Sequence, residues 1–155
     1  MENEILMMGI GNILMGDEGV GVIVARELQK RNLPRCEVVD GGTGSFFLLE
    51  YFHRYRKIVL IDATLDGKQA GTITVLKPRF SSDYPTTLTA HDIGLKDLLD
   101  SVYLLDHPLN VRLVAVSIKQ IQQASMELSP EIEAAVPRAV ETAIKQYREL
   151  LDTVQ

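Results

Sequence analysis

The sequence predicts an α/β domain in which a five-stranded sheet lies between layers of helices. Strand-like and helix-like segments alternate along the 155 residues, and the run Ile58–Ile61 contains only isoleucine, valine and leucine. Such a run is typical of a strand that is buried on both faces. A glycine-rich stretch, 9–21, follows the first predicted strand and leads into the first predicted helix. The length suits one domain with a single core, so we expect residues 1–155 to form one unit.

The first half of the chain contains three predicted strands and two predicted helices. In order they cover 4–9 (strand), 18–30 (helix), 37–39 (strand), 45–55 (helix) and 58–61 (strand). Within 18–30 the apolar residues recur at helical spacing, and the charged residues fall on the other side. Asn32, Leu33 and Pro34 end that helix. The segment 40–44, Asp-Gly-Gly-Thr-Gly, is a loop by composition.

The second half supplies the remaining two strands and two further helices. Residues 71–76 alternate polar and apolar, which predicts a strand near the edge of the sheet. A long polar loop, 78–90, separates it from a helix that follows His91. Loops of about a dozen residues in compact domains are often lids or binding loops. Residues 111–118 form the last predicted strand, and Ser129-Pro130 begins the final helix with a capping residue and a proline.

The composition excludes several classes of protein. The chain has 16 basic and 21 acidic side chains, a net charge of −5, so a nucleic-acid partner is not expected. The first residues lack the basic segment of a secretory leader, and no apolar run approaches the roughly 18 residues that span a bilayer. We therefore expect a cytoplasmic protein with no membrane partner. The single cysteine, Cys36, excludes a Cys-rich zinc site, and we expect it to be a buried and inert thiol.

Four acidic residues end predicted strands or lie in the loops just after them, and a histidine follows the long loop. They are Asp17, Glu18, Asp40, Asp62 and His91. Such residues meet at one edge if the strands are parallel, and carboxylates with one imidazole can hold nickel, zinc or copper. The alternative is that Asp17 caps the first helix and Glu18 interacts with its dipole.

A dinucleotide site is a second interpretation of the same residues. Gly9-Ile10-Gly11 follows a strand, and Asp40 ends the next one, where an acid would bind ribose. However, the glycine spacing is GxGxxxxG, and Asp17 and Glu18 would repel the pyrophosphate. Each repulsion at about 4 Å would cost on the order of 1 to 4 kcal/mol. No phosphate-binding lysine accompanies the loop, and neither HExxH nor GxSxG occurs in the sequence.

Four motifs, taken together and in this order, resemble the nickel–iron hydrogenase maturation endopeptidases. They are GIGNILMGDEGVG from Gly9, the Asp40-Gly41-Gly42-Thr43 segment, the strand that ends at Asp62, and HDIGL from His91. The resemblance covers nearly the whole chain. It implies a three-layer α/β/α fold with a twisted, mostly parallel five-stranded sheet.

The resemblance also implies an activity and a set of site residues. Members of this family remove a C-terminal extension from the hydrogenase large-subunit precursor after nickel insertion. Their metal-binding positions match Glu18, Asp62 and His91, and the ion is expected to be nickel carried by the precursor rather than retained by the enzyme. Asp40 matches a position linked to substrate. By family assignment the protease is of the aspartic type, with Asp17 and Asp40 as the candidate catalytic carboxylates.

Three further expectations complete this interpretation. We expect Glu18 and His91 at a solvent-facing edge, so that replacing them leaves the fold near wild type. At least one glycine among Gly9, Gly11 and Gly16 should have a positive φ. A non-catalytic module that binds the nickel-loaded precursor remains an alternative function, and the sequence does not indicate an oligomeric state.

Overall fold

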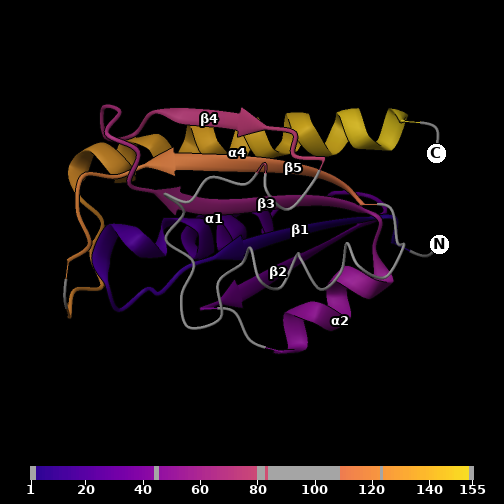
Figure 1. Cartoon of the computed structure of the whole chain (residues 1–155), viewed down its shortest axis with the longest axis horizontal. Helices are drawn as coiled ribbons and strands as arrows, with labels where there is room; N and C mark the ends of the chain where they lie inside the picture. Colours follow the sequence, from indigo (N-terminus) through magenta and orange to yellow (C-terminus); the bar gives the residue numbers. More distant parts are fainter. Residues whose placement is uncertain (1–2, 44–45, 80–82, 84–108, 123, 154–155) are drawn as a thin grey trace.

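The computed structural model describes residues 3–43, 46–79, 83, 109–122 and 124–153. Within them the chain forms one five-stranded sheet with helices on both faces (Figure 1). The elements are β1 (Ile5–Ile10), the 3₁₀ helix η1 (Gly16–Gly19), α1 (Val20–Leu28), β2 (Cys36–Gly42), α2 (Phe46–Arg54), β3 (Lys57–Thr64), β4 (Ile73–Leu76), β5 (Asn110–Ser117) and α4 (Pro130–Asp152).

The sheet has the order β2-β1-β3-β5-β4. All neighbours are parallel except β4, which pairs antiparallel with β5 at the edge. The five strands, the mostly parallel sheet and the edge position of β4 confirm the sequence-based expectations. Because β1 and β3 lie side by side in the centre and run in parallel, their carboxyl ends reach the same edge of the sheet.

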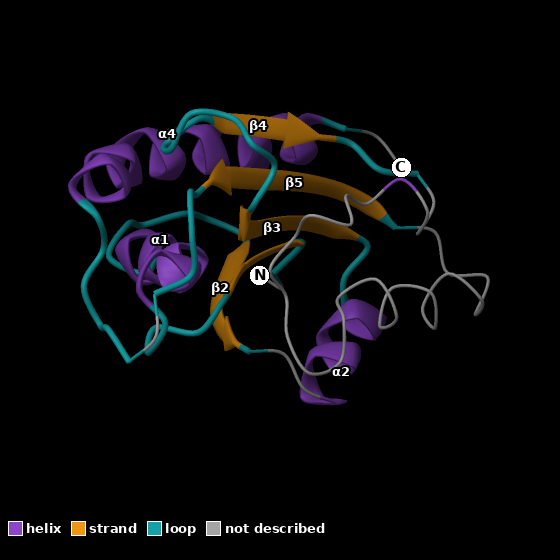
Figure 2. Ribbon diagram, turned by 60° about the vertical axis from the view of Figure 1, so that its left-hand side comes forward, coloured by secondary structure: helices purple, strands orange, loops and turns teal. Residues whose placement is uncertain are grey.

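Each strand contributes alternate residues to two separate cores, as the pleat requires. One core joins Met7, Val59 and Val114 to α1 and α4, and it includes Val24 and Val140. The other core lies on the opposite face, where α2 packs. Its members include Leu6, Met8, Phe52, Leu60 and Leu113. Figure 2 shows the resulting three layers, with α1 and α4 on one side of the sheet and α2 on the other.

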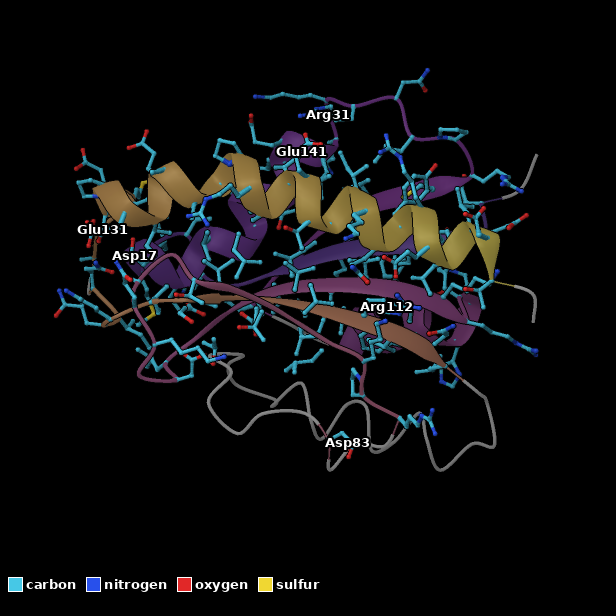
Figure 3. All side chains as sticks on the ribbon, turned by 90° about the horizontal axis from the view of Figure 1, so that it is seen from above. Asp17, Arg31, Asp83, Arg112, Glu131 and Glu141 are labelled. Atoms are coloured by element: carbon cyan, nitrogen blue, oxygen red, sulfur yellow. The ribbon has the colours of Figure 1, made fainter. Side chains whose placement is uncertain are left out.

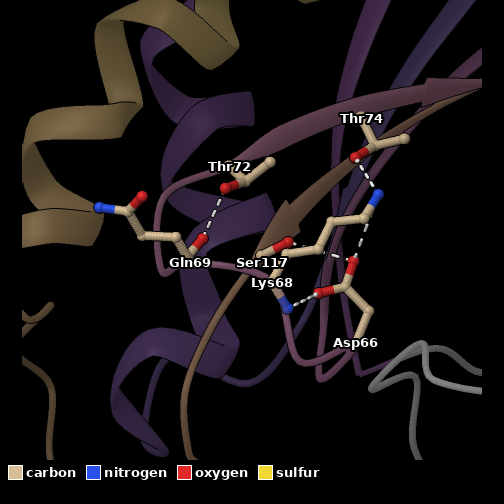
Figure 4. A network of polar contacts seen from close by, with 6 residues as sticks. All are labelled: Asp66, Lys68, Gln69, Thr72, Thr74 and Ser117. Carbon is tan, nitrogen blue, oxygen red and sulfur yellow. Dashed lines mark hydrogen bonds and ion pairs between the residues drawn. The ribbon is translucent and has the colours of Figure 1, made fainter.

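Polar contacts join α4 to the sheet and stabilise the turn that precedes the edge strand β4. Arg112 of β5 donates from one Nη to Gln146 and to Glu149 of α4, each at 2.9 Å (Figure 3). At the edge, Ser117 donates its hydroxyl to Asp66 at 3.1 Å, and Lys68 donates to Thr74 at 3.1 Å (Figure 4). These bonds hold the turn between β3 and β4 against the carboxyl end of β5.

Two segments differ from the sequence-based expectations. The predicted helix 18–30 is split, since its first turn is the 3₁₀ helix η1 and the α-helix begins only at Val20. The segment that begins at Asp40 was expected to be a loop, but β2 continues through it to Gly42. There Ile10 pairs with Gly42 after a shift in register, so backbone pairing with β1 overrides the loop-like composition. The predicted loop 78–90 falls largely outside the described residues, and the helix after His91 falls wholly outside them.

Candidate active site

The start of α1 packs directly against the backbone of two central strands. A Cβ atom at Gly21 would lie 2.4 Å from the carbonyl oxygens of both Ile10 and Ile61. A Cβ atom at Gly9 would lie 2.0 Å from the carbonyl oxygen of Gly21. No side chain fits at either position, so these two glycines let the helix backbone rest on β1 and β3. Helix η1, which precedes α1, contacts β3 as a result.

Glu18 lies in η1 and is completely buried. Its Oε2 accepts a hydrogen bond of 2.9 Å from the backbone N–H of Asn12. Its own backbone is enclosed as well, because a Cβ atom at Gly11 would lie 2.3 Å from the carbonyl oxygen of Glu18. The fold of the 11–19 segment therefore fixes the position of this carboxylate, and the Glu18 side chain is not free to change rotamer.

Asp62 comes from β3 and is also completely buried. It follows Ile61, whose carbonyl oxygen contacts Gly21, and Oδ1 accepts a 2.8 Å hydrogen bond from the N–H of Ala63. Since Gly21 is three residues beyond Glu18, the contact brings the two acidic residues to the same edge of the sheet. The expectation that Asp62 and Glu18 converge at the carboxyl edge is consistent with this packing.

Asp40 occupies a more open position at this edge. Its Oδ1 accepts from the N–H of Gly42 at 3.0 Å, and its Oδ2 lies 3.3 Å from Nε of Arg26 on α1. The side chain remains 33% exposed. It borders a pocket of about 380 Å³ whose lining also includes residues 11–14 and Arg26. Solvent can reach Asp40, in contrast to the two buried carboxylates.

Asp17 is 3% exposed, and its carboxylate contacts the segment that precedes α4. Oδ1 accepts from the N–H of Ser129 at 2.6 Å, and Oδ2 accepts from the Ser129 hydroxyl at 2.6 Å and from Gln122 Nε2 at 3.0 Å. Figure 3 shows Asp17 at the N-terminal end of α4, near Glu131. The alternative that Asp17 caps the helix after it does not match these contacts, because its partners belong to the segment before α4.

Two other sequence-based expectations concern the backbone of this glycine-rich loop and the exposure of Glu18. Gly11 has a φ of 151° and Gly16 a φ of 61°, so the prediction of a positive φ in this loop is confirmed. The expectation that Glu18 faces solvent is wrong, since the approach of Gly21 to Ile61 brings η1 against β3 and Glu18 is completely buried there. Replacing Glu18 must therefore be judged as a change in the protein interior.

The described residues supply only part of the expected ligand set. Among them, no three histidine, cysteine, aspartate or glutamate side chains are grouped so as to hold a metal ion. His91, the predicted imidazole ligand, lies outside the described residues. The same part of the chain contains no helix that is both long and apolar enough to cross a bilayer.

Cys36 begins β2 and is only partly buried, whereas the sequence-based expectation is a buried thiol. Burial, with a smaller contribution from the neighbouring Glu37 carboxylate, raises the pKa of its thiol to about 12. The reactive thiolate is therefore scarce at neutral pH.

Sequence reasoning missed the segment 122–129 as part of this edge. Gln122 and Asp17 are 105 residues apart in the chain, and no periodicity connects them. Ser129 did stand out as the cap of the final helix, but its hydroxyl donates to Asp17 and forms no capping bond. Only the folded backbone reveals these pairings.

Comparison with known proteins agrees with the motifs. A family model described as hydrogenase maturation protease matches residues 22–146. The hydrogenase 2 maturation protease of Escherichia coli is 30% identical over 150 residues, which cover 94% of this chain and 91% of the relative. The HupD hydrogenase expression/formation protein of Rhizobium leguminosarum is 27% identical, over 93% of this chain and 74% of its own.

Solved structures show the same relationship. The hydrogenase maturating endopeptidase HybD from Escherichia coli superimposes with a TM-score of 0.84 at 28% identity, covering 94% of this chain and 93% of that one. A [NiFe] hydrogenase maturation protease, HybD from Thermococcus kodakarensis, gives a TM-score of 0.74 at 26% identity, covering 92% and 97%. Since the family model spans most of the chain, this protein belongs to the hydrogenase maturation protease family.

Proposed function

We propose that this protein is the endopeptidase that removes the C-terminal extension of a nickel–iron hydrogenase large-subunit precursor once nickel is in place. Family membership supports the protease activity. The structural observation that carries the proposal is the pair of fully buried carboxylates, Glu18 and Asp62, which two different elements bring to one edge of the sheet.

Nickel enters this proposal as part of the substrate. Glu18, Asp62 and His91 would bind an ion that the precursor's own ligands already hold, so the ion bridges the two proteins. Two carboxylates and one imidazole occupy only part of a coordination shell, which leaves positions for the precursor. A bound nickel ion would polarise the carbonyl of the scissile peptide as a Lewis acid.

Asp40 is the better placed of the two proposed catalytic carboxylates. It borders an open pocket and keeps a third of its side chain exposed, so it can contact the precursor or a water molecule. Asp17 has both oxygens engaged with Ser129 and Gln122. We propose that Asp40 contacts the scissile segment of the precursor or activates a water molecule there, whereas Asp17 holds Glu18 in position.

The direct experiment incubates the purified protein with nickel-loaded and nickel-free precursor. Mass spectrometry of the released C-terminal peptide then reports cleavage. Cleavage of the nickel-loaded form alone is the expected result. Equal cleavage of both forms would contradict recognition of nickel, although it would still support the proposed protease activity. Tight binding of the nickel-loaded form without any cleavage would instead indicate the non-catalytic module.

A further inference from the structure

We propose that Asp17 is a positioning residue, and that Asp17, Gln122 and Ser129 together form a clamp that fixes Glu18 for contact with the precursor's nickel. This inference rests on the proposed function. The three residues are joined by five hydrogen bonds of 2.6 to 3.2 Å. They connect η1 to the segment immediately before α4, which is otherwise remote in sequence.

The donors and acceptors of the clamp fit one another without ambiguity. A backbone N–H can only donate, and an ionised carboxylate can only accept. Gln122 Oε1 accepts from the N–H of Asp17 at 2.9 Å, so its Nε2 must face the Asp17 carboxylate. Ser129 then donates both its N–H and its hydroxyl to the same carboxylate. Gln122 Nε2 also lies 3.2 Å from the Ser129 hydroxyl oxygen, which closes the set.

Backbone contacts beside the clamp tie the same two segments together. The N–H of Gly16 donates to the carbonyl of Ser125 at 2.6 Å, and the N–H of Ser125 donates to the carbonyl of Leu14 at 2.9 Å. Gly16 leaves room for the amide, since a Cβ atom there would lie 2.3 Å from Gln122 Oε1. The loop that carries Glu18 is therefore held on the α4 side by both backbone and side-chain bonds.

Glu18 is the next residue along η1, and so a rotation of Asp17 would also move Glu18. On its other side, Glu18 accepts the N–H of Asn12. The clamp and the Asn12 bond together leave the Glu18 carboxylate little freedom before substrate arrives. Preorganisation of this kind lowers the cost of binding. Asp17, whose oxygens accept three hydrogen bonds while almost fully buried, acts through Glu18 and does not touch the reacting atoms.

The test exchanges the carboxylate at position 17 and the amide at position 122. In Asp17→Asn an amide donor faces the Gln122 amide donor, and in Gln122→Glu two carboxylates face each other. The double variant restores complementarity, because the new amide at position 17 and the Ser129 hydroxyl can both donate to a carboxylate at position 122. Its net charge equals that of the wild type. We expect each single variant to cleave nickel-loaded precursor at least ~10-fold more slowly, and the double variant to recover to within about threefold.

Hydrogen exchange of the free protein supplies a readout that does not depend on cleavage. Amides of 12–18 should exchange faster in both single variants and return to wild-type protection in the double variant. All assays are run well below the unfolding transition, so that loss of folded protein does not explain a slower reaction. A double variant that regains protection but remains inactive would overturn the inference, because it would mean that the Asp17 carboxylate itself is required. If wild-type protein fails to cut the precursor, the proposed function fails instead.

Discussion

Two acidic segments meet at the carboxyl edge of the sheet, and they are built in opposite ways. The segment 11–19 carries Asp17 and Glu18, and both side chains are buried. Glu18 accepts a hydrogen bond from the N–H of Asn12, and Asp17 accepts one from the N–H of Ser129. The segment at the end of β2, which carries Asp40, is partly exposed and held by a short local hydrogen bond and one ion pair. The difference indicates a division of labour, in which the buried segment presents a fixed ligand and the open segment accommodates the precursor.

The largest expected effect comes from removing the charge of the buried carboxylates. Glu18→Gln keeps an acceptor for the N–H of Asn12, so we expect its free energy of unfolding to change by less than about 1.5 kcal/mol. Cleavage of nickel-loaded precursor should fall at least ~100-fold, because a neutral amide is a poor ligand for the ion. Asp62→Asn should behave in the same way. Peptide release by mass spectrometry, with urea unfolding as the stability control, measures both effects. Near-normal cleavage by either variant would contradict its assignment as a ligand.

A second substitution tests whether close packing fixes the buried segment. Gly21→Ala places a methyl group 2.4 Å from two backbone carbonyl oxygens, so the helix must move away from β1 and β3. We expect a loss of at least about 3 kcal/mol in the free energy of unfolding, at the upper end for overpacking. Gly67→Ala is the control. Its φ is positive, at 80°, but nothing lies within 4 Å of the new methyl group. The control should lose only about 1 kcal/mol, and equal losses would contradict the packing argument.

The open segment should tolerate change better. Asp40→Asn gives up an ion pair between partly exposed side chains, which is worth about 0.2–1 kcal/mol, so the fold should stay near wild type. If Asp40 acts on the precursor, cleavage should still fall by at least ~10-fold. Arg26→Gln removes the same ion pair from the other side and should keep the wild-type cleavage rate. Equal rates for the two variants would assign the effect to the ion pair and not to Asp40.

Cys36 lies away from both acidic segments and should have the smallest effect. Cys36→Ser should cleave precursor at the wild-type rate. Because burial raises the pKa of the thiol to about 12, the native protein should react with iodoacetamide at pH 8 at least ~100-fold more slowly than a free thiol.

The raised pKa of the Cys36 thiol also makes the free energy of unfolding depend on pH, and the sign of this dependence follows from proton binding. Above pH 9 the unfolded chain loses the thiol proton first, so stability should fall as pH rises from about 9 to about 12. That fall should be shallower in Cys36→Ser, and rapid alkylation of the native protein would contradict the assignment.

Some features of the fold and of these two segments could be predicted from the sequence, and others could not. The run Ile58–Ile61 and the alternation in 71–76 correctly predicted a strand buried on both faces and an edge strand, since the hydrophobic pattern reports burial directly. The glycine-rich motif correctly predicted a loop of unusual backbone shape between the first strand and the first helix. The burial of Glu18 was not foreseen, because it depends on the approach of Gly21 to Ile61, which no local pattern encodes. The same holds for Gln122, whose bond to Asp17 spans 105 residues.

In the proposed complex, Glu18 binds the nickel ion of the precursor, and Asp40 contacts the polypeptide of the precursor. The most direct measurement is the affinity of wild type, Glu18→Gln and Asp40→Asn for nickel-loaded and nickel-free precursor, by calorimetry with a cleavage-resistant precursor. Nickel should increase the affinity at least ~10-fold for wild type and for Asp40→Asn, and leave it unchanged for Glu18→Gln. A nickel-dependent gain of the same size in Glu18→Gln would contradict the account.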